Sequence, residues 1–226
     1  MRERLGRGAA AVSAVASVVL ALAGCGPAGE VSGDRPVEAG ASAAEALEEL
    51  EKLPVKGRAP MTGFDRDEFG PAWADVDRNG CDTRNDILKR DLEGETFKEG
   101  THGCIVLTGT LHDPYSGKTI EFERGQKTSL AVQIDHVVAL ADAWQKGAQR
   151  LSEERRRQLA NDPLNLLAVD GPLNGQKSAG DAATWLPPRR AYRCPYVARQ
   201  IRVKAEYGLW VTAAEKEAMV RVLKSC

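Results

Sequence analysis

Two segments, LAVQIDH at residues 130–136 and NLLAVDGPLNGQK at residues 165–177, decide the fold. The first is a candidate β-strand that runs directly into Asp135 and His136. The second begins as a short apolar strand and passes through an Asp-Gly-Pro turn into a helix that carries Asn174. The sequence therefore predicts two strands and a helix that hold a small set of polar side chains.

The Asp135-His136 pair places a hard oxygen ligand beside an imidazole. Metal-assisted hydrolysis of a phosphodiester needs a divalent cation and a base that titrates near neutral pH. Adjacent side chains of a regular strand point to opposite faces, so both groups serve one site only if the backbone bends there. We expect a helix that starts at Val137 and runs to Ala148 to provide this bend.

The spacing of these residues resembles the ββα-metal motif of HNH endonucleases, in which an asparagine opens the second strand and another follows nine positions later in the helix. Further stretches, FGPAW at residues 69–73, CDTRND at residues 81–86 and NDPLNL at residues 161–166, resemble secreted bacterial HNH-family proteins. These are related to the C-terminal nuclease domain of GmrSD-type restriction enzymes. The resemblance covers roughly residues 60–226, with a longer gap after His136 than in compact motifs.

The resemblance implies roles for four residues. Asp135 and Asn174 would bind the metal, His136 would be the general base, and Asn165 would orient that base. Asn161 is an alternative partner for the base, although its place at a helix end favours a capping role. A ligand pair without a second histidine favours Mg²⁺ or Mn²⁺ over Zn²⁺.

Two basic side chains are candidate contacts to the substrate phosphate. Lys177 shares a helix face with Asn174, and Arg84 lies in the cysteine-containing motif. A solvated lysine and an ion-paired arginine are the alternative interpretations. Residues 145–206 carry 12 basic and 6 acidic side chains, which suits a polyanion as a partner.

The N-terminus has the pattern of an export signal. A basic start and a small apolar run over residues 9–23 are typical of a signal peptide, since the run is too short to span a bilayer stably. It ends in LAGC, which resembles the lipobox of bacterial lipoproteins and predicts lipidation of Cys25. An ordinary signal peptide that happens to contain a cysteine is the alternative. We expect a signal peptide over residues 1–24, a flexible tether over 25–42 and a nuclease domain over 43–226.

The four remaining cysteines suggest two disulfide bonds in an exported chain. Cys81–Cys104 and Cys194–Cys226 are the favoured pairs, because each closes a loop within one half of the domain. A structural zinc site is the alternative, but the sequence contains no CxxC pair.

The rest of the pattern predicts an α+β fold, a small antiparallel sheet and ββα-metal element packed by helices. Expected helices cover residues 43–53, 82–92, 152–161, 195–207 and a final stretch after Thr212, and expected strands cover 104–111 and 118–122. The loop from Asp75 to Asp86 has the outline of an EF-hand but lacks the bidentate glutamate, so turn residues are the preferred interpretation.

We therefore expect a metal-dependent endonuclease that hydrolyses DNA, with RNA as a second candidate substrate, at low sequence specificity. Lipid anchoring would place it on the outer face of the bacterial membrane, or outside the cell if shed. No protein partner is implied. The alternative is a lipid-anchored, disulfide-stapled binding protein on an inactive HNH fold.

Overall fold

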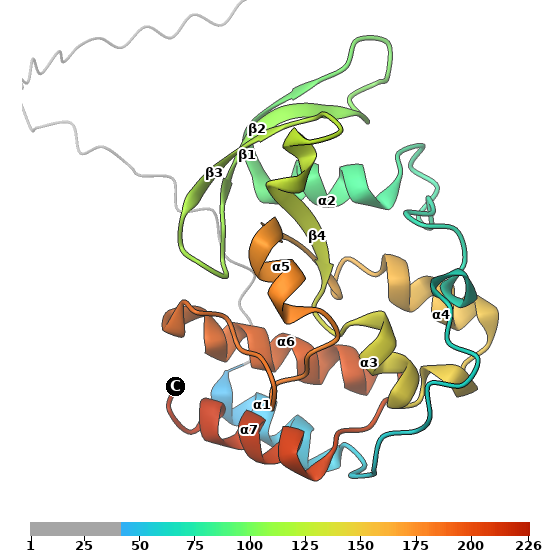
Figure 1. Cartoon of the computed structure of the whole chain (residues 1–226), viewed down its shortest axis with the longest axis vertical. Helices are drawn as coiled ribbons and strands as arrows, with labels where there is room; N and C mark the ends of the chain where they lie inside the picture. The colour runs from blue at the N-terminus through green and yellow to red at the C-terminus, as the bar shows by residue number, and fades with distance from the viewer. Residues whose placement is uncertain (1–41) are drawn as a thin grey trace, which may run out of the picture. The chain divides into compact units, whose positions relative to one another are not determined.

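The computed structural model describes residues 42–226 (Figure 1). The predicted signal peptide, the lipidation site Cys25 and nearly all of the tether lie outside these residues. The α+β class is confirmed. The helices are α1 (Ala43–Lys52), α2 (Thr83–Asp91), α3 (Leu140–Gln145), α4 (Glu153–Asn161), α5 (Gly171–Lys177), α6 (Arg193–Glu206) and α7 (Ala213–Leu223), and the strands are β1 (Leu92–Phe97), β2 (Val106–His112), β3 (Thr119–Glu123), β4 (Val132–His136) and β5 (Leu166–Asp170).

Two antiparallel sheets form in the described part of the chain. The first has the order β1-β2-β3, and its β2–β3 hairpin confirms the two strands expected there. Strand β1 was not predicted, because its sequence LEGETF lacks a clear alternation of apolar residues. The second sheet pairs β4 with β5 in an unbroken register from Val132↔Asp170 to His136↔Leu166.

Helices α1, α6 and α7 pack together beside the second sheet (Figure 1). Capping boxes start α1 at Ser42 and α7 at Thr212, where each hydroxyl accepts a hydrogen bond from the backbone N–H three residues on. Fully buried Leu50, Tyr196 and Met219 fill the space between these helices. No helix within residues 42–226 is long and apolar enough to cross a membrane.

The prediction of a helix from Val137 to Ala148 is wrong at its start and at its end. Regular β pairing continues through His136, and α3 begins only at Leu140. The helix ends at Gln145, because Gly147 adopts a φ of 124° that no helical residue has. The chain therefore does not bend into a helix at the Asp135-His136 pair.

Both predicted disulfides are confirmed. Cys81–Cys104 joins the segment before α2 to the loop before β2, and Cys194–Cys226 joins the first turn of α6 to the C-terminal residue. In the loop that resembles an EF-hand, the carboxylates accept hydrogen bonds from the loop itself. Asp75 and Asp77 both bind the backbone of Asn79, whose side chain donates to Asp86. This is the turn expected there.

Candidate active site

Strands β4 and β5 and helix α5 form the strand-turn-helix unit that carries the predicted site. Asp170 caps α5 by accepting a hydrogen bond from the N–H of Leu173 at 2.9 Å. Gly171 starts the helix so close to β4 that an added Cβ would lie 1.9 Å from the carbonyl oxygen of Leu130. Only glycine permits this approach, so the position of α5 against β4 depends on it.

The two members of the Asp135-His136 pair face different neighbours, as the regular strand requires. Asp135 is buried, with Oδ1 2.8 Å from Nζ of Lys177 and Oδ2 2.5 Å from the hydroxyl of Tyr115. Burial and the charge of Asp135 raise the pKa of Tyr115 well above its usual range, so the phenol stays protonated and donates. Both oxygens of Asp135 are therefore engaged.

Asn174 lies on the same side of β4 as Asp135. Its Nδ2 donates to Oε1 of Gln133 at 3.0 Å, and Gln133 is two positions before Asp135 on the strand. The structure thus brings Asp135 and Asn174 to one face, as predicted for a ligand pair. It adds Gln133, an amide oxygen that the sequence pattern did not single out.

His136 lies on the opposite face of β4. Its Nε2 is 2.9 Å from the carbonyl oxygen of Ala160, and because a carbonyl only accepts, Nε2 carries the proton. This tautomer leaves the lone pair on Nδ1. Burial lowers the pKa of His136 to about 4, against the opposing effects of that carbonyl and of Asp135. The imidazole is therefore neutral at physiological pH and able to accept a proton.

The indole of Trp73 stacks on the imidazole, with the ring centroids 6.0 Å apart and the planes 12° from parallel. Trp73 has a φ of 59°, which is rare for a bulky residue. Next to it, Thr83 donates from Oγ1 to the carbonyl of Ala74 at 2.5 Å. Sequence reasoning missed Trp73 as a site residue, although it lies in the FGPAW stretch of the resemblance.

The side chain of Asn165 forms hydrogen bonds with backbone atoms next to the site. Its Oδ1 accepts from the N–H of Val138 at 2.8 Å, and its Nδ2 donates to the carbonyls of Val138 and Leu159. It makes no hydrogen bond to the imidazole within the described residues. The side chain of Asn161 donates to Arg157 O inside α4. Asn165 therefore fixes the two segments on either side of His136, rather than the ring itself.

Of the two expected phosphate contacts, Lys177 is already engaged within the protein. Lys177 is 2% exposed, and its Nζ donates to Asp135 and, at 2.8 Å, to the backbone oxygen of His136. The guanidinium of Arg84 lies over the ring of Phe122, 5.8 Å from its centroid. The role predicted for Lys177 conflicts with its pairing to the buried carboxylate of Asp135. The role of Arg84, which is half-buried beside Phe122, stays a prediction.

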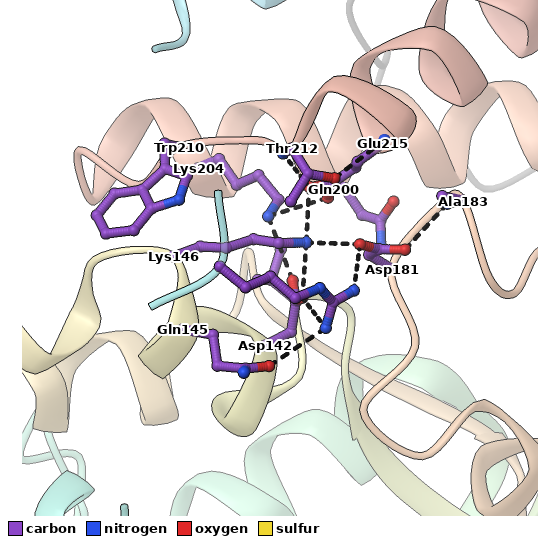
Figure 2. Close-up of polar contacts among 12 residues, drawn as sticks. Asp142, Gln145, Lys146, Asp181, Ala183, Gln200, Lys204, Trp210, Thr212 and Glu215 are labelled. Carbon is purple, nitrogen blue, oxygen red and sulfur yellow. Dashed lines mark hydrogen bonds and ion pairs between the residues drawn. The ribbon is translucent and has the colours of Figure 1, made fainter. Parts of the chain in front are cut away.

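A second group of charged side chains joins α3 to α6 and α7 (Figure 2). Lys146 is fully buried and lies 2.6 to 2.7 Å from Asp142, Asp181 and Glu215. Lys204 lies 3.3 Å from Asp142 and 3.0 Å from Glu215, and Arg58 reaches Asp181 at 2.7 Å. We call these six residues the α3–α7 charge network. Although burial acts to lower it, Asp142 and Glu215 raise the pKa of Lys146, so the lysine stays charged.

The described residues contain no group of three or more His, Cys, Asp or Glu side chains arranged to hold a metal ion. The oxygens of Asp135, Asn174 and Gln133 are nevertheless hard donors on one face of β4 and α5. Such oxygens match the chemistry of Mg²⁺ or Mn²⁺, whereas a Zn²⁺ site usually uses histidine or cysteine.

Comparison with known proteins identifies a family and a relative. A protein of Arthroderma benhamiae described as an uncharacterized secreted protein is 36% identical over 188 residues, which are 82% of this chain and 86% of the relative. No solved structure matches. The family model of the C-terminal domain of GmrSD restriction endonucleases matches residues 82–222, which include all of β4, β5 and α5. The chain therefore belongs to the family of GmrSD restriction endonuclease C-terminal domains, and its function is of the nuclease type.

Proposed function

We propose that this protein is an HNH-type endonuclease that hydrolyses phosphodiester bonds in DNA, with His136 as the general base. The observation that carries the proposal is the state of the imidazole. Nε2 is committed to the carbonyl of Ala160, so Nδ1 has a lone pair for a water proton.

In the proposed reaction a water molecule attacks the phosphorus and gives its proton to Nδ1 of His136. A new P–O bond forms as the bond to the leaving oxygen breaks. The carbonyl of Ala160 then also stabilises the imidazolium, because it accepts from Nε2 throughout. The stacked indole of Trp73 and the backbone contacts of Asn165 restrict the movement of the ring.

We assign Asp135 and Asn174 as the residues that would hold a divalent cation, with Mg²⁺ or Mn²⁺ favoured over Zn²⁺. Because Asp135 and His136 face opposite sides of β4, this proposal requires the scissile phosphate to lie across the end of the strand. A cation bound there would neutralise negative charge on the phosphate and the leaving oxygen. The donor chemistry supports this assignment, since both residues offer oxygens on one face of β4 and α5.

The pairing of Asp135 with Lys177 is the observation that favours the alternative function, a binding protein on an inactive HNH fold. A carboxylate whose two oxygens are engaged by protein groups need not bind a cation. Titration of the protein with Mn²⁺, followed by calorimetry, separates the two functions. Binding that Asp135→Asn abolishes supports the nuclease, and no binding supports the alternative.

We further propose that the protein is exported and held at the outer face of the membrane by a lipid on Cys25. The secreted relative supports export, and the LAGC sequence supports the anchor. Replacement of Cys25 by serine should move the protein from the membrane fraction to the soluble fraction. DNA would then be met outside the cytoplasm, and within residues 42–226 no recognisable base-reading element indicates a preferred sequence.

The test of catalysis is plasmid nicking by the purified protein with a panel of divalent metals. His136→Ala should lower the rate by about 10²- to 10⁴-fold, the usual contribution of a general base. His112→Ala is the matched control, because His112 is an exposed histidine that contacts only Glu93 and Thr119 in the described part of the chain. Nicking by His136→Ala at the wild-type rate would refute the mechanism.

A further inference from the structure

A groove of about 780 Å³ lies between the start of α6 and the end of α7. Its twelve lining residues include three arginines, Arg190, Arg193 and Arg221, and no aspartate or glutamate. The remaining lining residues are small, apolar or cysteine, apart from Ser225. The groove is therefore a positively charged surface.

The charges in the groove differ from those of other arginines in the chain. Arg155, Arg156 and Arg157 on α4 each lie within 2.9 Å of a glutamate. Within residues 42–226, by contrast, no ion pair joins Arg190 or Arg193 to a carboxylate, and Arg221 has only an exposed contact of 3.9 Å to Glu217. Arginine charge that the protein itself does not compensate is available to an anionic ligand.

The groove is connected to the candidate active site through a short chain of contacts. The N–H of Arg189 donates to the carbonyl of Tyr115 at 3.0 Å, and the ring of Tyr192 lies 6.1 Å from that of Tyr115. Tyr115 in turn holds Asp135 through its hydroxyl. The segment with these residues links α5 to α6 (Figure 1), so one continuous stretch of chain leads from the site to the groove.

The shape of the groove is fixed covalently. Cys194 and Cys226 both line it, and their disulfide holds the C-terminus beside the first turn of α6. Arg193 is also fixed, because its Nε donates to the carbonyl of Pro187 at 2.8 Å. A preformed arginine surface loses less conformational freedom on binding than a flexible basic tail would.

We propose that this groove binds the phosphodiester backbone of the nucleic acid substrate, away from the bond that is cleaved. The proposal rests on the proposed nuclease function and adds a substrate-binding surface to it. Guanidinium groups bind phosphate through paired hydrogen bonds, and contacts to the backbone carry no sequence information. Binding at the groove therefore holds DNA of any sequence on the protein without contacting its bases.

The test compares Arg190→Ala/Arg221→Ala with the control Arg155→Ala/Arg157→Ala, whose arginines are neutralised by glutamates. Fluorescence anisotropy of a labelled DNA duplex of about two helical turns gives the Kd as a function of salt. The groove variant should bind about 10-fold more weakly at low salt, and its slope of log K against log salt should fall by about 1 to 2, one unit for each lost phosphate contact. The control should bind like the wild type.

Hydrolysis of bis(p-nitrophenyl) phosphate, too small to reach the groove, should be equal in wild type and groove variant. If the wild type binds and cuts DNA and the groove variant binds it equally well, the groove proposal fails and the proposed function stands. A variant that keeps DNA binding but loses binding to phosphatidylglycerol vesicles would overturn the proposal in favour of a lipid headgroup. Wild-type protein that neither binds nor cuts DNA would overturn both.

Discussion

The α3–α7 charge network and the end of β4 both bury a lysine against carboxylates, but they differ in how completely the groups are paired. In the network three cations face three carboxylates, and Lys146 contacts all three carboxylates (Figure 2). At the end of β4 Lys177 faces the single carboxylate of Asp135, and beside it His136 keeps one ring nitrogen unbonded in the described chain.

The two regions therefore differ in the bonding capacity that remains. In the network the charged groups pair with one another. At the strand end the imidazole has one nitrogen bonded to the carbonyl of Ala160, and the amide and carboxylate oxygens lie on the opposite face of β4. The proposed reaction depends on this remaining bonding capacity rather than on burial of charge.

The largest expected effect is the loss of stability in Lys146→Met. Removal of this lysine leaves the three carboxylates of the α3–α7 charge network with two cations, so one buried carboxylate is no longer compensated. Breaking one side of a buried ion pair costs about 3–5 kcal/mol. Urea unfolding should show a fall of that size in the free energy of unfolding.

Lys216→Met is the matched control, because its pair with Glu51 lies at the surface. Exposed pairs contribute about 0–1 kcal/mol, so this variant should unfold nearly as the wild type does. Equal losses in both variants would show that the network does not stabilise the fold through its charge.

Lys177→Met should cost about 3 kcal/mol, because Asp135 loses its cation but keeps the hydroxyl of Tyr115. The double variant Lys177→Met/Asp135→Asn removes both charges and should recover most of this loss. Recovery measured by urea unfolding would show that charge balance is what the lysine supplies. If the double variant is less stable than either single variant, charge balance between Lys177 and Asp135 does not explain the stability that the lysine contributes.

The third prediction concerns pH. The pKa of His136 in the folded protein is about 4, below the value of about 6.5 in an unfolded chain. The unfolded state therefore binds more protons between these values, and the free energy of unfolding should fall as the pH drops from about 6.5 to 4, by at most about 3 kcal/mol. His136→Gln should remove this part of the acid sensitivity.

Thermal unfolding of the wild type and His136→Gln between these two pH values measures the effect. His112→Gln, altered at an exposed histidine, should keep the wild-type pH dependence. Parallel curves for wild type and His136→Gln would mean that the imidazole is not held neutral in the fold.

The smallest effect is expected for Tyr115→Phe. The change removes the hydrogen bond from the hydroxyl to Oδ2 of Asp135 but leaves the packing of the ring against Trp185 and Tyr196. A hydrogen bond to a charged group contributes about 1.5–3 kcal/mol, and Lys177 limits the loss, so we expect about 1–2 kcal/mol in urea unfolding. A loss as large as that of Lys177→Met would mean that the hydroxyl, not the lysine, holds the carboxylate.

The sequence predicted the strand pair, α5 and both disulfides because each has a local signal: an apolar run, a turn or the position of cysteines. It did not predict that Asp135 and His136 face apart, since that depends on whether the strand stays regular, which the pairing of β4 with β5 decides. The start of α3 was placed too early because Val137 has helical spacing with Leu140, whereas Asn165 binds the backbone N–H groups of Val137 and Val138.

The burial of Lys177 and Lys146 could not be read from the sequence. A lysine four residues after an aspartate, as at Asp142 and Lys146, is the pattern of an exposed helix pair. Lys146 also pairs with Asp181 and Glu215, which come from distant segments and enclose the pair in the interior. The stacking of Trp73 on His136 was missed for the same reason, because the two are far apart in the chain.

The α3–α7 charge network also constrains the order in which the chain can fold. Its members run from Arg58 to Glu215, so Lys146 and Lys204 acquire Glu215 only when α7 docks. Earlier states in which α3 and α6 pack alone would bury lysines with too few carboxylates, which is unfavourable. We therefore expect α3, α6 and α7 to assemble cooperatively, with the docking of α7 as the step that completes the charge network.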